Sequence, residues 1–242
     1  MNTINMILQG KGGVGKTLVS SIIAQYKAKN GTLPRCIDTD PVNATFTEYK
    51  LLETQPLDIV DDDNKIDEGK FDQLMEMLLT EDIDFVVDNG ASTFVPLTAY
   101  LAENNAIELL VDAEKTVNIH VVVTGGQAMS DTLTGLAKML ETMPRQANIV
   151  VWLNEYFGPV ELQGKNFEEM KVYSENKEII RGIIRIPKKT QATFGRDVEM
   201  MLKEKLTFDQ AIHSEKFNLM SKSRLSIMKK SLFSQMDNVM EL

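Results

Sequence analysis

A glycine-rich run near the start of the chain constrains its fold more than any other feature. It lies between an apolar, strand-like segment, residues 4–9, and a segment of helical periodicity, residues 18–28, and reads Gly10-Lys11-Gly12-Gly13-Val14-Gly15-Lys16-Thr17. Glycines lack a Cβ atom, so the backbone can curl until successive N–H groups point at phosphate oxygens. The positive end of the following helix dipole adds to that field. The pattern G-x-x-x-x-G-K-[ST] therefore predicts a phosphate-binding loop, in which Lys16 contacts the β- and γ-phosphates and the Thr17 hydroxyl ligates Mg²⁺.

Apolar runs of strand length alternate with helical segments along the rest of the chain. The further predicted strands are residues 36–38, 57–60, 85–88, 108–111, 120–124, 149–153 and 182–186. Helices are predicted over residues 71–79, from the glycine pair at 125–126 to residue 140, and from residue 198 onward. Such alternation favours a parallel sheet, and right-handed crossovers place helices on both of its faces. We therefore expect one α/β domain over residues 1–242, with a doubly wound, mostly parallel sheet between two helical layers.

Composition excludes several other classes of protein. The chain has 43% hydrophobic and 25% charged residues, as ordinary soluble domains do, and no run approaches the ~18 apolar residues of a membrane span. The N-terminus enters an apolar strand without a basic leader, which favours a cytoplasmic location. Cys36 is the only cysteine, so neither an internal disulfide nor a CxxC pair can form. His120 and His213 are too few and too far apart to indicate a metal site.

Lys11 makes the prediction for the loop more specific. With this second lysine after the first glycine, the loop resembles the deviant Walker A loop of the ParA/MinD superfamily of P-loop ATPases. The resemblance implies the P-loop NTPase fold, ATP/ADP and Mg²⁺ as ligands, and a homodimer on ATP binding in which Lys11 reaches the partner's nucleotide. It also implies that Lys11 neutralises charge in trans during hydrolysis, much as an arginine finger does. The alternative for Lys11 is an ordinary solvated lysine.

Acidic residues follow two of the predicted strands. Asp38 and Asp40 stand at i and i+2, so both can point to one side beyond the carboxyl end of their strand. Residues 37–45 resemble the family's switch I, which implies that Asp38 holds the Mg²⁺ hydration shell and Asp40 positions or deprotonates the attacking water. Val42 departs from that pattern. Asp88 ends an apolar run like a Walker B acid that binds Mg²⁺. The alternatives are a capped Asp-Pro turn and a structural strand-end acid.

Two later segments resemble the family's base-binding elements. Asn154 ends the strand of residues 150–154, and in the family a residue at this place reads adenine through its amide. Pro187, in the segment 186–188, resembles the loop that closes over the other side of the ring. Leu18, directly after the loop, completes the predicted nucleotide-binding set. An asparagine after a strand is often only a turn former, and Trp152 is expected in the core.

The C-terminal segment, residues 213–242, is predicted to form a basic amphipathic helix. Its apolar residues at roughly helical spacing are Phe217, Met220, Leu225, Met228, Leu232 and Met236, with basic residues between them. The helix can pack on the sheet or on a partner subunit. Alternatively, residues 216–233 can meet an anionic membrane as a peripheral anchor, a partner protein, or DNA.

The resemblance extends well over about the first 125 residues and loosely over the rest. It implies a slowly hydrolysing, ATP-dependent dimerisation switch that positions or loads a macromolecular cargo or secretion-machinery partner. The chain length and the Asp-Pro-Val-Asn segment suggest the conjugal-transfer TraL-like branch. The alternatives are a plasmid or chromosome partition ATPase that binds DNA non-specifically, disfavoured by the net charge of −9, and a metabolic ligase or kinase-like enzyme. An iron–sulfur cluster is not expected, since Cys36 has no paired cysteine.

Overall fold

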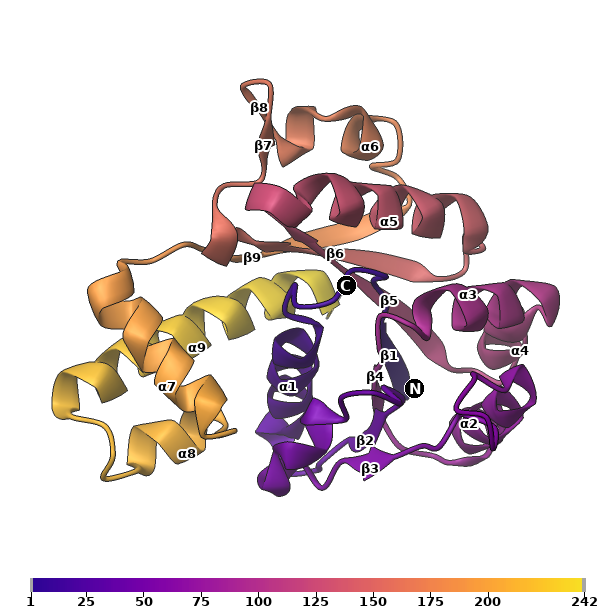
Figure 1. Ribbon diagram of the computed structural model, residues 1–242, viewed down its shortest axis with the longest axis horizontal. Helices are drawn as coiled ribbons and strands as arrows, with labels where there is room; N and C mark the ends of the chain where they lie inside the picture. The colour runs from indigo at the N-terminus through magenta and orange to yellow at the C-terminus, as the bar shows by residue number, and fades with distance from the viewer. Residues whose placement is uncertain (1, 241–242) are drawn as a thin grey trace.

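A seven-stranded, wholly parallel sheet organises the molecule, as the computed structural model of residues 2–240 shows (Figure 1). In spatial order its strands are β3 (Gln55–Pro56), β2 (Arg35–Asp38), β4 (Phe85–Asp88), β1 (Thr3–Ile7), β5 (Thr116–Thr124), β6 (Asn148–Asn154) and β9 (Ile180–Ile186). A separate antiparallel hairpin pairs β7 (Glu161–Leu162) with β8 (Lys165–Asn166). The predicted doubly wound α/β class is confirmed.

Helices cover both faces of the sheet and close two hydrophobic cores (Figure 1). One face carries α2 (Phe71–Thr80), α3 (Phe94–Glu103), α4 (Ala106–Asp112) and α5 (Met129–Thr142). The other carries α1 (Lys16–Lys27), α7 (Arg196–Lys203), α8 (Phe208–His213) and α9 (Leu219–Met240). The short helix α6 (Lys171–Ser174) follows the hairpin. Because the central strands are buried on both sides, they read in sequence as continuous apolar runs.

The strand register brings three loops to one edge of the sheet. Ile7 pairs with Asp88, and Asp88 pairs with Asp38, so β1, β4 and β2 end at the same level. The glycine loop follows β1 at this level and leads directly into α1. In open parallel sheets the crevice beyond the carboxyl ends of the strands is where ligands bind. The topology therefore places the loop and both acidic strand ends around one crevice.

Two of the predicted strands were wrong. Residues 108–111 lie in helix α4, where Ala106, Ile107 and Leu110 are buried and Leu109 is half exposed. A short apolar run cannot be assigned to helix or strand from periodicity alone, which explains this error. The strand predicted at 57–60 does not form: the strand at this edge is β3, which ends at Pro56, and within the predicted range only Val60 pairs, in an isolated antiparallel bridge with Ile66.

Helix α9 lies against the sheet with one apolar face. Phe217, just before it, and Leu225, Met228, Leu232 and Met236 are buried in the core, as expected from their spacing, but Met220 is 64% exposed. The helix starts at Leu219, because His213 ends α8 and residues 214–218 connect the two. None of the helices within residues 2–240 is both long and apolar enough to span a membrane.

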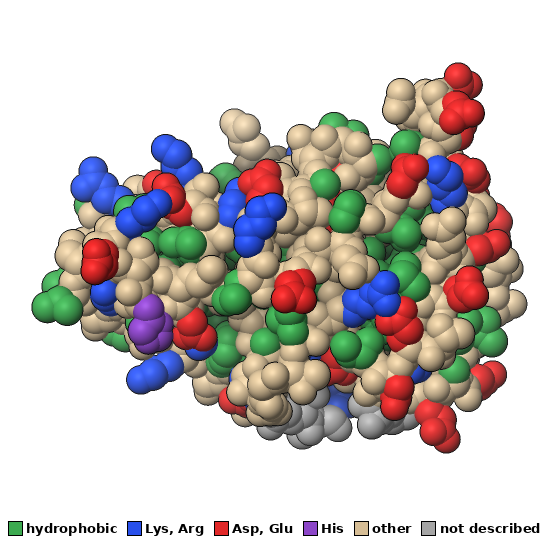
Figure 2. All heavy atoms as spheres, turned by 90° about the horizontal axis from the view of Figure 1, so that it is seen from below, with side chains coloured by type: hydrophobic (Ala, Val, Ile, Leu, Met, Phe, Trp, Pro, Cys, Tyr) green, Lys and Arg blue, Asp and Glu red, His purple; other side chains and the backbone are tan. Residues whose placement is uncertain are grey.

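Basic residues concentrate at the end of the molecule formed by α7, α8 and α9. Residues 188–230 contain ten Lys and Arg but five Asp and Glu, and Figure 2 shows Lys and Arg side chains gathered on the left, with acidic ones prevailing on the right. Three of the five basic residues in 216–230 pair with acids of the same region. Lys216 contacts Glu204, Arg224 Nε lies 2.5 Å from Asp197, and Lys229 Nζ lies 2.7 Å from Asp209. Much of the positive charge of the predicted basic helix is thus neutralised within the molecule.

A buried polar network connects three central strands beneath α1 and α9. The Trp152 indole N–H donates to His120 Nδ1 at 3.0 Å, so the ring proton lies on Nε2 and is donated to Asn5 Oδ1 at 3.2 Å. Asn118 Nδ2 donates to the same oxygen at 3.1 Å. Every polar atom of the histidine ring is therefore satisfied in its neutral form, and burial lowers the pKa of His120 to about 3 from its ordinary 6.5.

This network predicts acid sensitivity. Because the folded-state pKa of His120 lies below the unfolded value of 6.5, only the unfolded state takes up the proton between pH 6.5 and 3. As the pH falls through this window, His120 should lower the free energy of unfolding by about 1.4 kcal/mol for each pH unit. Above pH 6.5 it should have no effect on the free energy of unfolding. Urea unfolding at several pH values, for wild type and His120→Gln, measures this. Carboxylates titrate in both proteins, so parallel pH profiles would contradict the prediction.

Candidate functional site

The glycine loop has the left-handed backbone that its glycines permit. Gly13 has φ 73° and Gly15, at the N-cap of α1, has φ 101°, a region that side chains with a Cβ atom rarely adopt. A Cβ atom at Gly15 would also lie 2.8 Å from the Asn154 amide nitrogen. The loop therefore needs glycine at this position for two independent reasons, and it directs the N-terminus of α1 toward the crevice.

The two lysines of the loop have different environments. Lys16 is buried, and its Nζ donates to the Lys11 carbonyl at 3.1 Å. Burial lowers the pKa of Lys16, while the carboxylates of Asp88 and Asp40 act in the opposite direction. The Lys11 side chain is 44% exposed and forms an ion pair of 2.8 Å with Asp131, in the first turn of α5. Lys16 thus faces the crevice, whereas the Lys11 side chain lies outside it.

Asp88, at the end of β4, is held by two hydroxyl groups of α1. Thr17 donates to its Oδ2 at 2.7 Å and Ser20 donates to its Oδ1 at 2.8 Å. Burial raises the pKa of Asp88 to about 7, although both hydrogen bonds and Lys16 favour the charged form. A carboxyl group in this setting lacks a full counter-charge, which a divalent cation beside it would supply.

Asp38 and Asp40 shape the loop that follows β2. Asp38 is buried, and its two oxygens accept backbone N–H groups of Asp40 at 3.0 Å and Phe46 at 2.9 Å. Asp40 accepts the N–H groups of Val42 and Asn43 through one oxygen, each at 3.0 Å. Both acids therefore cap turns, the alternative considered from the sequence, but only Asp40 reaches the wall of the neighbouring cavity.

A cavity of about 600 Å³, here called the phosphate cavity, joins these groups. Its wall includes Lys16, Thr17, Asp40 and Asp88, together with glycines of the loop. Thr17 and Asp88 offer neighbouring oxygens there, which fit Mg²⁺, a cation that prefers oxygen ligands and keeps several waters. Within residues 2–240 no group of three or more His, Cys, Asp or Glu could hold a metal by itself. Phosphate oxygens and water would therefore complete the coordination.

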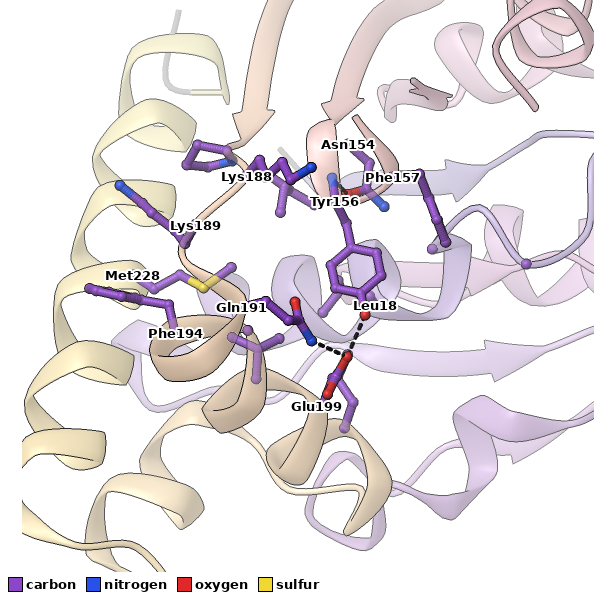
Figure 3. Close-up of a pocket in the computed structure, with 17 residues that line it drawn as sticks. Leu18, Asn154, Tyr156, Phe157, Lys188, Lys189, Gln191, Phe194, Glu199 and Met228 are labelled. Carbon is purple, nitrogen blue, oxygen red and sulfur yellow. Dashed lines mark hydrogen bonds between the residues drawn. The ribbon is translucent and has the colours of Figure 1, made fainter. Parts of the chain in front are cut away.

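A second cavity of about 340 Å³, here called the base cavity, adjoins the first (Figure 3). The two share Gly13, Gly15 and Leu18 in their walls, and Asn154 and Pro187 both line the base cavity. The Asn154 amide donates to the Val14 carbonyl at 2.9 Å, so it ties β6 to the glycine loop. Most of the lining from α7, α9 and the π-helical turn Gln191–Gly195 was not foreseen, because no local motif marks it.

A parallel sheet whose first strand leads through a glycine loop into a helix, with acidic residues at the adjacent strand ends, defines a P-loop NTPase fold. Residues 5–197 match the family described as the CobQ/CobB/MinD/ParA nucleotide binding domain. The chain belongs to this family, and the resemblance inferred from the loop is confirmed.

Relatives match the whole length of the chain. Two Escherichia coli proteins, each named Protein TraL, are 49% identical over 237 residues and 48% identical over 238 residues, covering 98% of both chains in each case. Among solved structures, the MinD cell division protein of Aquifex aeolicus has 17% identity and a TM-score of 0.49, covering 97% of this chain and 98% of that one. A plasmid partition protein of Borrelia burgdorferi has 15% identity and a TM-score of 0.41, covering 84% and 96%.

Proposed function

We propose that this protein is an ATP-dependent dimerisation switch that hydrolyses ATP slowly and positions or loads a macromolecular cargo during plasmid conjugal transfer. The observation that carries the proposal is the phosphate cavity, where Lys16, Thr17, Asp40 and Asp88 meet beside the glycine loop. Membership of a nucleotide-binding family supports it. The TraL relatives support the link to conjugation.

Lys16 and the loop N–H groups would bind the phosphates. In the structure the Lys16 ammonium is held by the Lys11 carbonyl, a neutral partner that a phosphate oxygen can replace with a stronger, charge-assisted hydrogen bond. Thr17 and Asp88 would hold Mg²⁺, Asp88 through water, and Asp38 would act at a distance by fixing the loop that carries Asp40. When bound, Mg²⁺ would neutralise the charge that develops on the phosphate oxygens.

Asp40 would orient the attacking water or accept its proton. Its Oδ1 atom is engaged by the N–H groups of Val42 and Asn43, which fix the carboxylate in the cavity wall. Within residues 2–240 its other oxygen makes no hydrogen bond, and can therefore accept one from water. Lys11 is absent from this constellation, so we expect slow hydrolysis until a second subunit supplies its own Lys11.

Gly90 provides a specific test of the role of Asp40. A Cβ atom at Gly90 would lie 2.8 Å from Asp40 Cγ and 3.1 Å from its Cα, so Gly90→Ala must displace that carboxylate. We expect the rate of ATP hydrolysis to fall roughly 10- to 100-fold, because displacing a catalytic group by about 1 Å can slow a reaction to this extent. The affinity for ADP should not change. Steady-state phosphate release and calorimetry measure the two effects. Gly69→Ala is the matched control, since its Cβ would approach a carboxylate, Asp67, outside both cavities.

The proposal as a whole is tested first by nucleotide binding and then by plasmid transfer. Calorimetry should show Mg²⁺-dependent binding of ATP, and mating assays should show fewer transconjugants when the wild-type chain is replaced by a Lys16→Ala chain. ATP binding without a transfer defect would support the nucleotide-binding site and reject the conjugal role. Salt-sensitive, ATP-dependent DNA binding would instead favour a partition protein.

A further inference from the structure

An aromatic side chain, that of Tyr156, forms part of the wall of the base cavity. It belongs to none of the nucleotide-binding motifs found in the sequence. Tyr156 follows the last residue of β6 by two positions and lies in the short turn Glu155–Phe157. Its side chain lines the base cavity, and the residue is 42% exposed. In Figure 3 the ring extends from the end of β6 toward Glu199, and Gln191 reaches the same carboxylate.

The Tyr156 ring is held at both ends. Its backbone N–H donates to Asn154 Oδ1 at 3.2 Å, which fixes the start of the side chain beside the glycine loop. Its hydroxyl donates to Glu199 Oε1, on α7, and Gln191 Nε2 donates to the same oxygen at 2.7 Å. Because one contact comes from the end of β6 and the other from α7, they fix both ends of the Tyr156 side chain in the wall of the base cavity.

Three aromatic residues line the base cavity: Tyr156, Phe157 and Phe194. Phe194 lies under two cations, with Lys189 Nζ at 5.7 Å and the Arg224 guanidinium at 6.0 Å from its ring centroid. The ring of Phe157 meets Tyr156 at 89° with centroids 5.0 Å apart, so the two rings touch edge to face and Phe157 can cover at most one face of Tyr156.

The Asn154 amide is already engaged. It donates to the Val14 carbonyl and accepts from the Tyr156 backbone, so in this structure it serves the loop and the turn. Contact with a planar base must then come largely from the cavity wall. An exposed aromatic face beside a phosphate-binding loop provides such a contact, because every nucleobase presents a π-face of its own.

We propose that Tyr156 is a positioning residue whose ring stacks on the base of the bound nucleotide, and that Glu199 and Gln191 hold the ring in place. This inference rests on the proposed nucleotide-binding function. Stacking reads the face of a base and not its edge. The contact therefore strengthens binding of purine nucleotides generally, without choosing adenine over guanine.

The test compares ligands with and without a base. We expect Tyr156→Ala to weaken ADP and GDP about 10-fold or more by calorimetry, and to leave the affinity for inorganic tripolyphosphate unchanged. Tyr156→Phe keeps the ring but removes its hydrogen bond to Glu199, so it should weaken ADP only several-fold, through faster ADP dissociation. Glu199→Ala removes the same hydrogen bond and should weaken ADP to a similar, several-fold extent. Tyr100→Phe is the matched control, because it removes a tyrosine–carboxylate hydrogen bond, to Asp72, outside both cavities.

Other outcomes separate this inference from the proposed function. Wild-type affinity for ADP in Tyr156→Ala, or an equal loss of ADP and tripolyphosphate, would overturn the stacking role while leaving nucleotide binding intact. A wild-type protein that binds tripolyphosphate and ADP equally well would also overturn it. If the wild-type protein binds neither ligand, both proposals fail. Thermal unfolding of each variant confirms that the variants are folded.

Discussion

Replacing Lys16 with alanine is expected to weaken nucleotide binding strongly, and to stop hydrolysis, while leaving the fold intact. Lys16 is buried in the wall of the phosphate cavity, where, within residues 2–240, its ammonium group has only the Lys11 backbone carbonyl as a hydrogen-bond acceptor. Loss of one member of a buried, hydrogen-bonded charge pair costs about 2 to 5 kcal/mol, or roughly 30- to 5,000-fold in affinity for ATP. Calorimetry with Mg-ATP measures the effect.

Lys16→Ala should not lower the stability of the ligand-free protein. Burial lowers the pKa of Lys16, so its charged form is not stabilised by the fold in the absence of an anion. A matched control is Lys27→Ala, in the last turn of the same helix, where the lysine lies 3.5 Å from Asp84 and away from both cavities. If Lys16→Ala bound ATP as tightly as the control does, the glycine loop would not be the phosphate site.

The elements that carry strong local signals were predictable from sequence. The glycine loop and the strand that ends at Asp88 follow from glycine chemistry and a continuous apolar run, and both lie where expected. Helix α3 was missed, because it starts close to Pro96, a residue usually associated with loops but tolerated in the first turn. The strand predicted at residues 108–111 was wrong because burial of one face of α4 determines its structure, and a four-residue run does not reveal that face.

The candidate site was only partly predictable for a different reason. The spacing of Asp38 and Asp40 predicted that both lie in the site. In the structure, Asp38 holds the loop through its hydrogen bonds, and only Asp40 lines the phosphate cavity. The base cavity combines β6, the π-helical turn and α7, which are far apart in sequence. The ion pair of Lys11 with Asp131 is equally non-local. Such pairings depend on tertiary packing, so no single segment encodes them.

The solution mass with Mg-ATP should respond in opposite ways to substitutions of Lys11 and Asp40. Light scattering is expected to show that wild type is monomeric with ADP and dimeric with ATP, that Asp40→Ala keeps the ATP-bound dimer, and that Lys11→Ala loses it. Asp40 would act on water after the dimer has formed, so its loss should slow hydrolysis and trap the dimer. Lys11 would contribute to the partner's site, so its loss should weaken the interface and lower the hydrolysis rate by ~10³ to 10⁵.

The Lys11–Asp131 ion pair provides the control for this experiment. Both side chains are more than 40% exposed, so the pair contributes at most about 1 kcal/mol and should not prevent Lys11 from leaving for a partner subunit. Asp131→Ala should therefore dimerise with ATP at least as well as wild type. If Lys11→Ala and Asp131→Ala both lost the dimer, the ion pair within the subunit would be the important contact. If the mass stayed constant while ATP bound, Lys11 would have no role in trans, and a constitutive complex or a small phosphoryl acceptor would explain the site better.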